Sequence, residues 1–134
     1  MRARAALAAA LEDAKFDGQF RDVAEYSTIE TLEKSSMDGR ACYKVKVVRK
    51  TGRESVDCYG VEDKLLVATI ETRDGAEGIT IARNYKDFGG IKLPTQLVIQ
   101  AGGFEQVVTI AKVELNNVPA TKFDPPAAIK ALIK

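Results

Sequence analysis

The sequence predicts a mainly β (α+β) protein. The expected fold is a strongly curved antiparallel meander sheet of about seven strands, a half-barrel, with short N- and C-terminal helices covering its concave face. After residue 25, apolar and polar side chains alternate with a period of two. Turn signals such as Asp38-Gly39 and Asp74-Gly75 recur at intervals of about 11 to 15 residues. That spacing suits strands joined by hairpin turns and is too short for helical crossovers between parallel strands.

Length and composition indicate one domain and exclude much chemistry. The chain has 134 residues, of which 46% are hydrophobic and 29% charged, so residues 1–134 are expected to form a single curved-sheet domain. Its formal net charge of +1 gives no strong attraction to nucleic acid or an anionic membrane. It contains no histidine, the usual general base and the commonest zinc ligand. We therefore expect no enzymatic activity, no metal and no cofactor.

The N-terminal segment resembles a signal peptide but fits a helix better. Met1 to Leu11 begins with two arginines and continues with alanine and leucine, but the apolar run is short, and the acidic pair Glu12-Asp13 follows it directly. Its apolar residues instead recur at helical spacing, at Ala3, Leu7, Ala10, Leu11 and Ala14. We expect a helix with a solvated acidic pair near its end, and neither an export signal nor a membrane anchor.

Strands and a final helix are expected after this segment. The predicted strands are Ser27–Ser36, Ala41–Lys50, Arg53–Gly60, Lys64–Thr72, Gly78–Phe88, Ile91–Gln100 and Phe104–Leu115. The last strand carries apolar residues on both parities, which predicts a bulge or burial of both faces. Pro94 predicts an edge position or a bulge within its strand. A short helix is expected over Pro126–Lys134, with an apolar stripe at Ile129, Leu132 and Ile133.

The two cysteines, Cys42 and Cys58, lie on the two arms of one predicted hairpin that turns at Thr51-Gly52. A two-residue turn places Cys58 opposite Val45 and Cys42 opposite Val61, with the thiols on opposite faces. We therefore expect two free, mostly buried thiols. A disulfide between them is the alternative.

Alternation within the strands predicts one apolar face and one solvated face. We interpret the apolar face as a surface that binds a hydrophobic ligand. Composition alone favours the alternative, in which the helices fill the concavity and this face is only the core. The candidate ligand-binding residues are Tyr43, Val45, Val47, Ile79, Ile81, Tyr85, Leu93, Leu97 and Ile99.

Other motifs favour ordinary structural roles. The pairs Gly89-Gly90 and Gly102-Gly103 lack the spacing of phosphate-binding loops, so we interpret them as hairpin turns. Basic residues gather around one hairpin, but acidic residues share the exposed strand positions, so we expect a solvated sheet face and no nucleic-acid partner. The basic residues are Lys44, Lys46, Arg49, Lys50 and Arg53, and the acidic ones are Glu54, Asp57, Glu105 and Glu114.

A series of short motifs resembles those of a known family. They are FDGQF at 16–20, MDGRACYKV at 37–45, TGRE at 51–54, VEDKLLV at 61–67, NYKDF at 84–88 with GGIKLP at 89–94, VELN at 113–116, and Phe123 followed by Pro126. In their order and spacing the chain is similar to the outer-membrane lipoprotein-sorting protein-like family of the lipoprotein-carrier superfamily. That resemblance implies an incomplete β-barrel with helices over its open side, in a non-enzymatic protein of the periplasm or cell envelope. Its apolar interior would receive acyl chains.

Full-length members of that family usually have an export signal and more strands before the matched region, so this chain looks like the C-terminal part of a longer protein. The leading hypothesis is non-enzymatic binding of a lipid or lipoprotein acyl chain in the concave face of the sheet. The alternative is a structural or protein-interaction module, an accessory domain of a larger secreted protein, that pairs with its partner through an edge strand.

Overall fold

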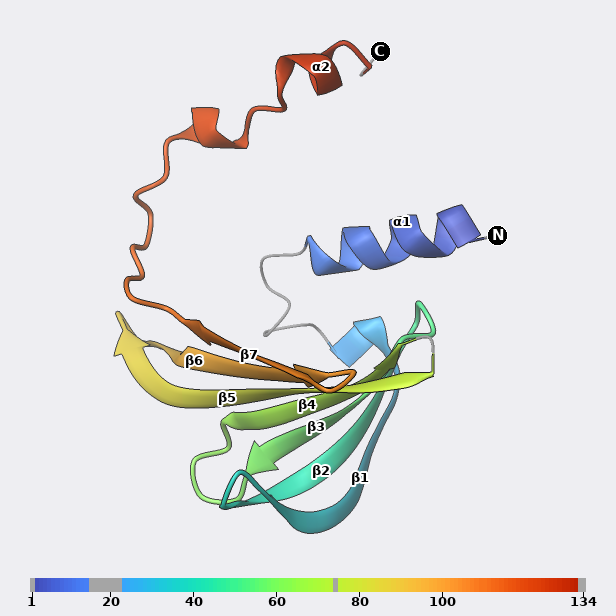
Figure 1. Cartoon of the computed structure of the whole chain (residues 1–134), viewed down its shortest axis with the longest axis vertical. Helices are drawn as coiled ribbons and strands as arrows, with labels where there is room; N and C mark the ends of the chain where they lie inside the picture. The colour runs from blue at the N-terminus through green and yellow to red at the C-terminus, as the bar shows by residue number, and fades with distance from the viewer. Residues whose placement is uncertain (1, 15–22, 74, 133–134) are drawn as a thin grey trace.

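A computed structural model describes residues 2–14, 23–73 and 75–132. Its seven strands form one unclosed antiparallel sheet in the order β1-β2-β3-β4-β5-β6-β7 (Figure 1), which confirms the predicted mainly β class and its meander topology. The strands are β1 (Tyr26–Met37), β2 (Arg40–Arg49), β3 (Glu54–Gly60), β4 (Leu66–Arg73), β5 (Ala76–Phe88), β6 (Ile91–Ala101) and β7 (Phe104–Thr109). The helices are α1 (Arg2–Asp13) and α2 (Ala127–Lys130), with short 3-10 turns η1 (Val23–Glu25) and η2 (Ala120–Phe123).

The predicted turn residues make tight hairpins. Asp38 and Gly39 connect the paired residues Met37 and Arg40, and both have positive φ, 52° and 72°. A two-residue turn of this kind matches the right-handed twist of the flanking strands, and aspartate followed by glycine is one of the few pairs that adopt it readily. Asp74, from another predicted turn, lies outside the described residues.

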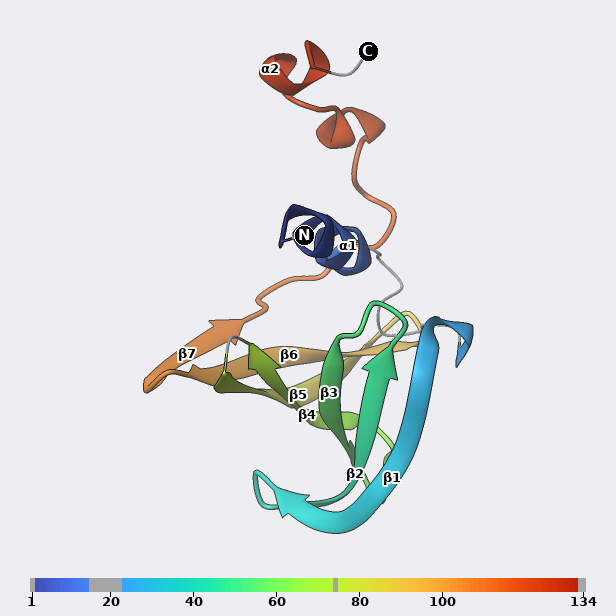
Figure 2. The ribbon, with the colours of Figure 1, turned by 90° about the vertical axis from the view of Figure 1, so that its right-hand side faces the viewer.

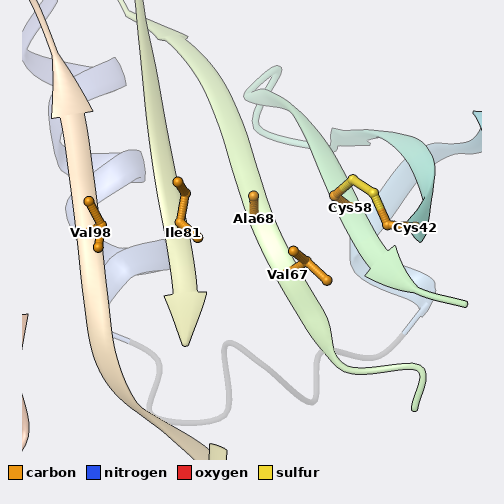
Figure 3. Close-up of a cluster of buried hydrophobic side chains, with 6 residues drawn as sticks. All are labelled: Cys42, Cys58, Val67, Ala68, Ile81 and Val98. Atoms are coloured by element: carbon orange, nitrogen blue, oxygen red, sulfur yellow. A yellow bond between two sulfur atoms is a disulfide. The ribbon is translucent and has the colours of Figure 1, made fainter. Parts of the chain in front are cut away.

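Cross-strand pairing gives each face of the sheet its own set of side chains. One row of directly opposed residues runs Cys58, Ala68, Ile81 and Val98. These residues, together with Cys42 and Val67, form a buried cluster whose members are at most 7% exposed (Figure 3). We call this face the core face. The adjacent row runs Val45, Asp57, Thr69, Thr80 and Ile99 and belongs to the opposite face.

Curvature of the sheet helps to bury the core face. Figure 2 shows β1–β3 bent away from the direction of β5–β7. At the tip of the first hairpin, Asp38 accepts two hydrogen bonds from Arg83 of β5, at 2.6 and 2.8 Å. Met37, next to that tip, packs against the buried cluster. The first hairpin therefore reaches across the core face, and burial of this face comes largely from the sheet itself.

The expectation of two free thiols is wrong, because the hairpin has a different register. The amide of Arg49 donates to the carbonyl of Arg53 at 2.9 Å, so three residues rather than two form the loop. This one-residue difference places Cys58 opposite Lys44, on the same face as Cys42. Their Cα atoms are 5.6 Å apart, and the two cysteines form a disulfide.

The seventh strand is shorter than predicted. The strand ends at Thr109, one more backbone hydrogen bond runs from the Ile110 amide to the Thr95 carbonyl, and Leu115, which was expected to belong to the strand, is exposed. The mixed pattern therefore marks the end of the strand and neither a bulge nor burial of both faces. Pro94 lies in β6 beyond the last β6–β7 pair, Gln96 with Thr109, so β7 does not pair with it. This local edge agrees with the expected position of Pro94.

The two helices differ from the cover expected over one apolar face. α1 lies beside the sheet, but α2 is carried away from it by the extended segment after β7 (Figures 1 and 2). Ile129 and Leu132 of the C-terminal stripe are exposed, and Ile133 lies outside the described residues. In the parts of the chain that the structure describes, no helix is long and apolar enough to cross a membrane.

Candidate functional site

The nine predicted ligand-binding residues do not share one face. Ile79 and Ile81 lie on the core face, where Ile81 belongs to the buried cluster and Ile79 packs against it. Five others lie on the opposite face, by register and alternation: Tyr43, Val45, Val47, Leu97 and Ile99. The prediction of a common face is therefore wrong. Alternation within a strand shows that two faces differ, but only cross-strand register shows which faces join across the sheet.

The remaining two candidates lie beyond an irregularity in the β5–β6 hairpin. Asn84 has a φ of 55°, and its carbonyl accepts a hydrogen bond from the Thr95 hydroxyl at 2.7 Å. Past this point Tyr85 pairs with Pro94, and Leu93 pairs with Lys86. The Tyr85 hydroxyl donates to the carbonyl of Leu66 at 2.8 Å, so its polar end is bound to the neighbouring strand β4. Both residues therefore lie beyond a residue with left-handed backbone, although the β5–β6 register is the same on its two sides, with Arg83 opposite Gln96 and Tyr85 opposite Pro94.

The face opposite the core face is anchored to α1 through an ion pair. Arg49 shares its side of β2 with Val47, and its Nε lies 2.7 Å from Oε1 of Glu12. The Thr51 hydroxyl donates to Oε2 of Glu12 at 2.8 Å. The side chain of Glu12 is 6% exposed and that of Arg49 is 13% exposed. We call this the α1 face. The expectation of a solvated Glu12 is wrong, because the carboxylate has an arginine partner on the sheet.

Polar side chains also occupy the middle of the α1 face. Ser55 is buried opposite Val47, and Asp57 is half-buried opposite Val45. Asp57 was expected among exposed acidic residues, which the structure contradicts. Burial raises the pKa of the Asp57 carboxyl, while a hydrogen bond with Thr69 opposes that shift. A carboxyl group is thus held in a poorly hydrated place on this face.

Tyr59 borders this polar group. Its hydroxyl lies 3.5 Å from Oδ2 of Asp57. Burial, followed by the nearby Asp57 charge, raises the pKa of Tyr59 to about 12. The phenol therefore stays protonated at neutral pH and supplies a donor rather than a second negative charge.

The basic residues around the β2–β3 hairpin are mostly neutralised by carboxylates. Nη2 of Arg53 donates to both carboxylate oxygens of Glu71 at 3.0 Å. Lys44 pairs with Glu33 at 3.2 Å, and Lys46 pairs with Glu54 at 3.3 Å. Together with the Arg49–Glu12 pair, these contacts balance the charge of four of the five predicted basic residues, and Lys50 is exposed.

This arrangement can bind charged and hydrogen-bonding groups beside apolar ones. Arg49 offers a largely buried guanidinium, Asp57 a carboxylate and Tyr59 a hydroxyl, with Val47 adjacent. Sequence reasoning missed Glu12 and Asp57 as site residues, because an acidic residue in a helix or strand carries no signal for a distant partner. In residues 2–14, 23–73 and 75–132 there is no group of three or more histidine, cysteine, aspartate or glutamate side chains placed to hold a metal ion.

A separate surface depression lies at the β6–β7 hairpin. Ile79, Phe104 and Glu105 are among its lining residues, and Phe104 is exposed. It is open to solvent and lies at the β7 edge of the sheet, away from the Arg49–Glu12 pair. None of its lining residues belongs to the buried cluster or to the group of Arg49, Asp57 and Tyr59 on the α1 face.

Comparisons with known proteins identify no relative of this chain. No protein-family model matches the chain, and neither a curated protein nor a solved structure shows significant similarity to it.

Proposed function

We propose that this protein binds a hydrophobic ligand, a lipid or lipoprotein acyl chain, on the α1 face together with α1, and catalyses no reaction on it. The observation that carries the proposal is the exposure of α1. Leu7 and Leu11, one helical turn apart, are each 61% exposed, although Glu12 anchors the same helix to the sheet. An apolar stripe on a docked helix normally faces a core. Here it is available to an apolar ligand.

The chain exposes more surface than a compact monomer of its mass, and part of this surface belongs to the extended segment after β7. The accessible surface of the chain is 10138 Å². A compact monomer of 14.6 kDa is expected to expose about 6,900 Å². Burial of apolar surface is worth about 25 cal/mol per Å², so covering a few hundred Å² supplies useful binding free energy without specific polar contacts.

The proposed location is the periplasm or another part of the bacterial cell envelope. Two observations support it. The motif series resembles the lipoprotein-sorting protein-like family, and Cys42 and Cys58 form a disulfide. Disulfides persist mainly in oxidising compartments, which include the periplasm.

Uptake of a fluorescent fatty-acid probe tests the binding function. We expect stoichiometric uptake by the wild type and loss of uptake in Leu11→Glu and Leu97→Glu, because each change adds a charge to the proposed apolar surface. Leu132→Glu is the control, since Leu132 is equally apolar but lies on the C-terminal segment, away from the sheet. Failure of the folded wild type to take up the probe would contradict the proposal. So would full uptake by both Leu11→Glu and Leu97→Glu.

A second candidate function, pairing with a partner protein through an edge strand, is favoured by β1. This 12-residue strand ends the sheet, and among the strands that the structure describes it pairs with β2 alone. Its Ile29 and Leu32 are exposed. Long apolar edges readily accept another strand. A mass above that of the monomer in light scattering, with no bound lipid in native mass spectrometry, would favour this function. The double variant Ile29→Lys, Leu32→Lys would then be monomeric.

A further inference from the structure

The contact between α1 and the sheet that the structure describes is made by a carboxylate and not by an apolar stripe. Among the α1 side chains that the structure describes, only Glu12 is buried, while Leu7 and Leu11 remain exposed. A movement of α1 would break this charged contact without uncovering Leu7 or Leu11, because both are already exposed. One competing carboxylate at the same place would remove the principal described contact between α1 and the sheet.

The sheet side of this contact is a well-defined carboxylate site. Arg49 and Thr51 hold one oxygen each of the Glu12 carboxylate, at 2.7 and 2.8 Å. The hairpin that carries them is fixed by backbone hydrogen bonds, including that from the Lys50 amide to the carbonyl of Glu25 at 3.1 Å. Nη1 of Arg49 is buried and has no hydrogen-bond partner within the described parts of the chain. The guanidinium therefore has a donor to spare for an incoming group.

Apolar residues are close in the sequence to both members of the Arg49–Glu12 ion pair. On the sheet, buried Val47 lies two residues before Arg49 in β2, so both side chains belong to the same face. On the helix, Leu11 is adjacent to Glu12, and Leu7 lies one turn earlier. A charged site next to apolar surface matches a molecule with a carboxylate head and a hydrocarbon chain.

We infer that Arg49 and Thr51 form the head-group site for a fatty-acid carboxylate, and that Glu12 occupies this site as an internal competitor until the fatty acid displaces it. The inference rests on the proposed function and specifies its ligand class. Exchange replaces one carboxylate by another, so the guanidinium remains paired and no buried charge is left alone. The ligand chain then covers apolar surface that Glu12 itself cannot cover.

The test compares three ligands with the same hydrocarbon chain, laurate, methyl laurate and lauryl alcohol, by displacement of a fluorescent probe from the full chain. The wild type is expected to bind laurate about tenfold more tightly than lauryl alcohol, because a charge-assisted hydrogen bond contributes more than a neutral one. Arg49→Met is expected to abolish that preference. Glu12→Gln removes the competing charge and is expected to tighten laurate binding about threefold to tenfold, with lauryl alcohol unchanged.

Matched controls remove charges from pairs elsewhere on the sheet. Arg83→Met breaks the pair with Asp38, and Glu33→Gln breaks the pair with Lys44. Neither change is expected to alter the laurate preference. Equal affinity of the wild type for laurate and lauryl alcohol would overturn this inference while leaving hydrophobic binding intact. Absence of binding by all three ligands would overturn the proposed function as well. Should Arg49→Met fail to fold, unchanged laurate affinity in Glu12→Gln would still overturn the inference.

Discussion

The core face and the α1 face are built from the same strands but differ in chemistry. On the core face, small apolar residues and the Cys42–Cys58 disulfide fill the inside of the curl. On the α1 face, the neighbouring positions carry Ser55, Asp57 and Arg49. Adjacent residues in a strand point to opposite sides, so a single step along β3, from Cys58 to Asp57, passes from one chemistry to the other.

This difference between the faces indicates that the core face mainly stabilises the fold, whereas the α1 face carries the groups suited to binding. Burial of apolar side chains stabilises the fold, whereas burial of a carboxyl or a guanidinium costs desolvation free energy that its partner only partly offsets. The α1 face thus contains buried polar groups whose desolvation lowers the stability of the sheet. We expect substitutions on the core face to alter the free energy of unfolding most, and substitutions on the α1 face to act mainly on α1 and on ligands.

The largest effect is expected from Ile81→Ala on the core face. Ile81 is 7% exposed, and truncating a buried isoleucine leaves a cavity that costs about 2–5 kcal/mol of unfolding free energy. Urea denaturation followed by circular dichroism measures the change. The control is Ile29→Ala at the exposed edge β1, expected to cost under about 1 kcal/mol. Equal losses in both variants would refute the distinction between these two regions.

Removal of the disulfide is expected to cause the second-largest loss of unfolding free energy. The bond joins residues 16 apart in sequence, and a closed loop of this size restricts the unfolded chain by about 3 kcal/mol. The double variant Cys42→Ala, Cys58→Ala should therefore unfold at lower urea than the wild type. Reductant should destabilise the wild type and leave the double variant unchanged. A wild type indifferent to reductant would show that the bond contributes no stability.

A smaller effect is expected from Arg49→Met on the α1 face. The variant removes the arginine partner of Glu12, but α1 can then release its carboxylate to water, so the global loss of unfolding free energy is expected to be about 1 kcal/mol. Faster hydrogen exchange should be confined to the backbone of residues 2–14. The exposed pair of Arg83 with Asp38 provides the control, because Arg83→Met should leave exchange in α1 unchanged. Unaltered exchange in Arg49→Met would mean that the ion pair does not hold the helix.

The pH dependence of the unfolding free energy should reveal the contribution of the desolvated Asp57 carboxyl on the α1 face. Because burial raises the pKa of Asp57 above 3.8, the folded protein keeps this proton at a pH where the unfolded chain has lost it. Its contribution to stability is therefore greatest below pH 3.8 and falls as the pH rises through the folded pKa. Asp57→Asn should lack that fall in urea titrations across this range. An identical pH profile in wild type and variant would contradict this role of burial.

Asp38, at the rim of the core face, should behave in the opposite sense. The hydrogen bond with Arg83 lowers the pKa of Asp38 below 3.8, so the stabilising contribution is present above that pH and is lost as the pH falls through the folded pKa. Asp38→Asn preserves a residue that tolerates positive φ and removes the charge. The stability difference from wild type should shrink below pH 3.8. A difference that persists in acid would show that the turn, not the charge, matters. We expect this effect to be the smallest, because the pair is partly exposed.

The sequence by itself determined the elements and their order. Alternation and turn residues such as Asp38-Gly39 predicted seven strands close to those observed, because hairpin geometry depends on a few adjacent residues. The resemblance to lipoprotein-sorting proteins stays a prediction, as does the function drawn from it.

Tertiary structure decided which residues meet. A three-residue loop in place of a two-residue loop brought Cys42 and Cys58 to one face, and the same kind of register relation divided Ile81 from Leu97. Only the folded chain showed that Glu12 reaches Arg49, 37 positions later in the sequence. The physical reason is that strand formation follows local patterning, whereas the face of a side chain and the partner of a charge depend on pairing between distant segments.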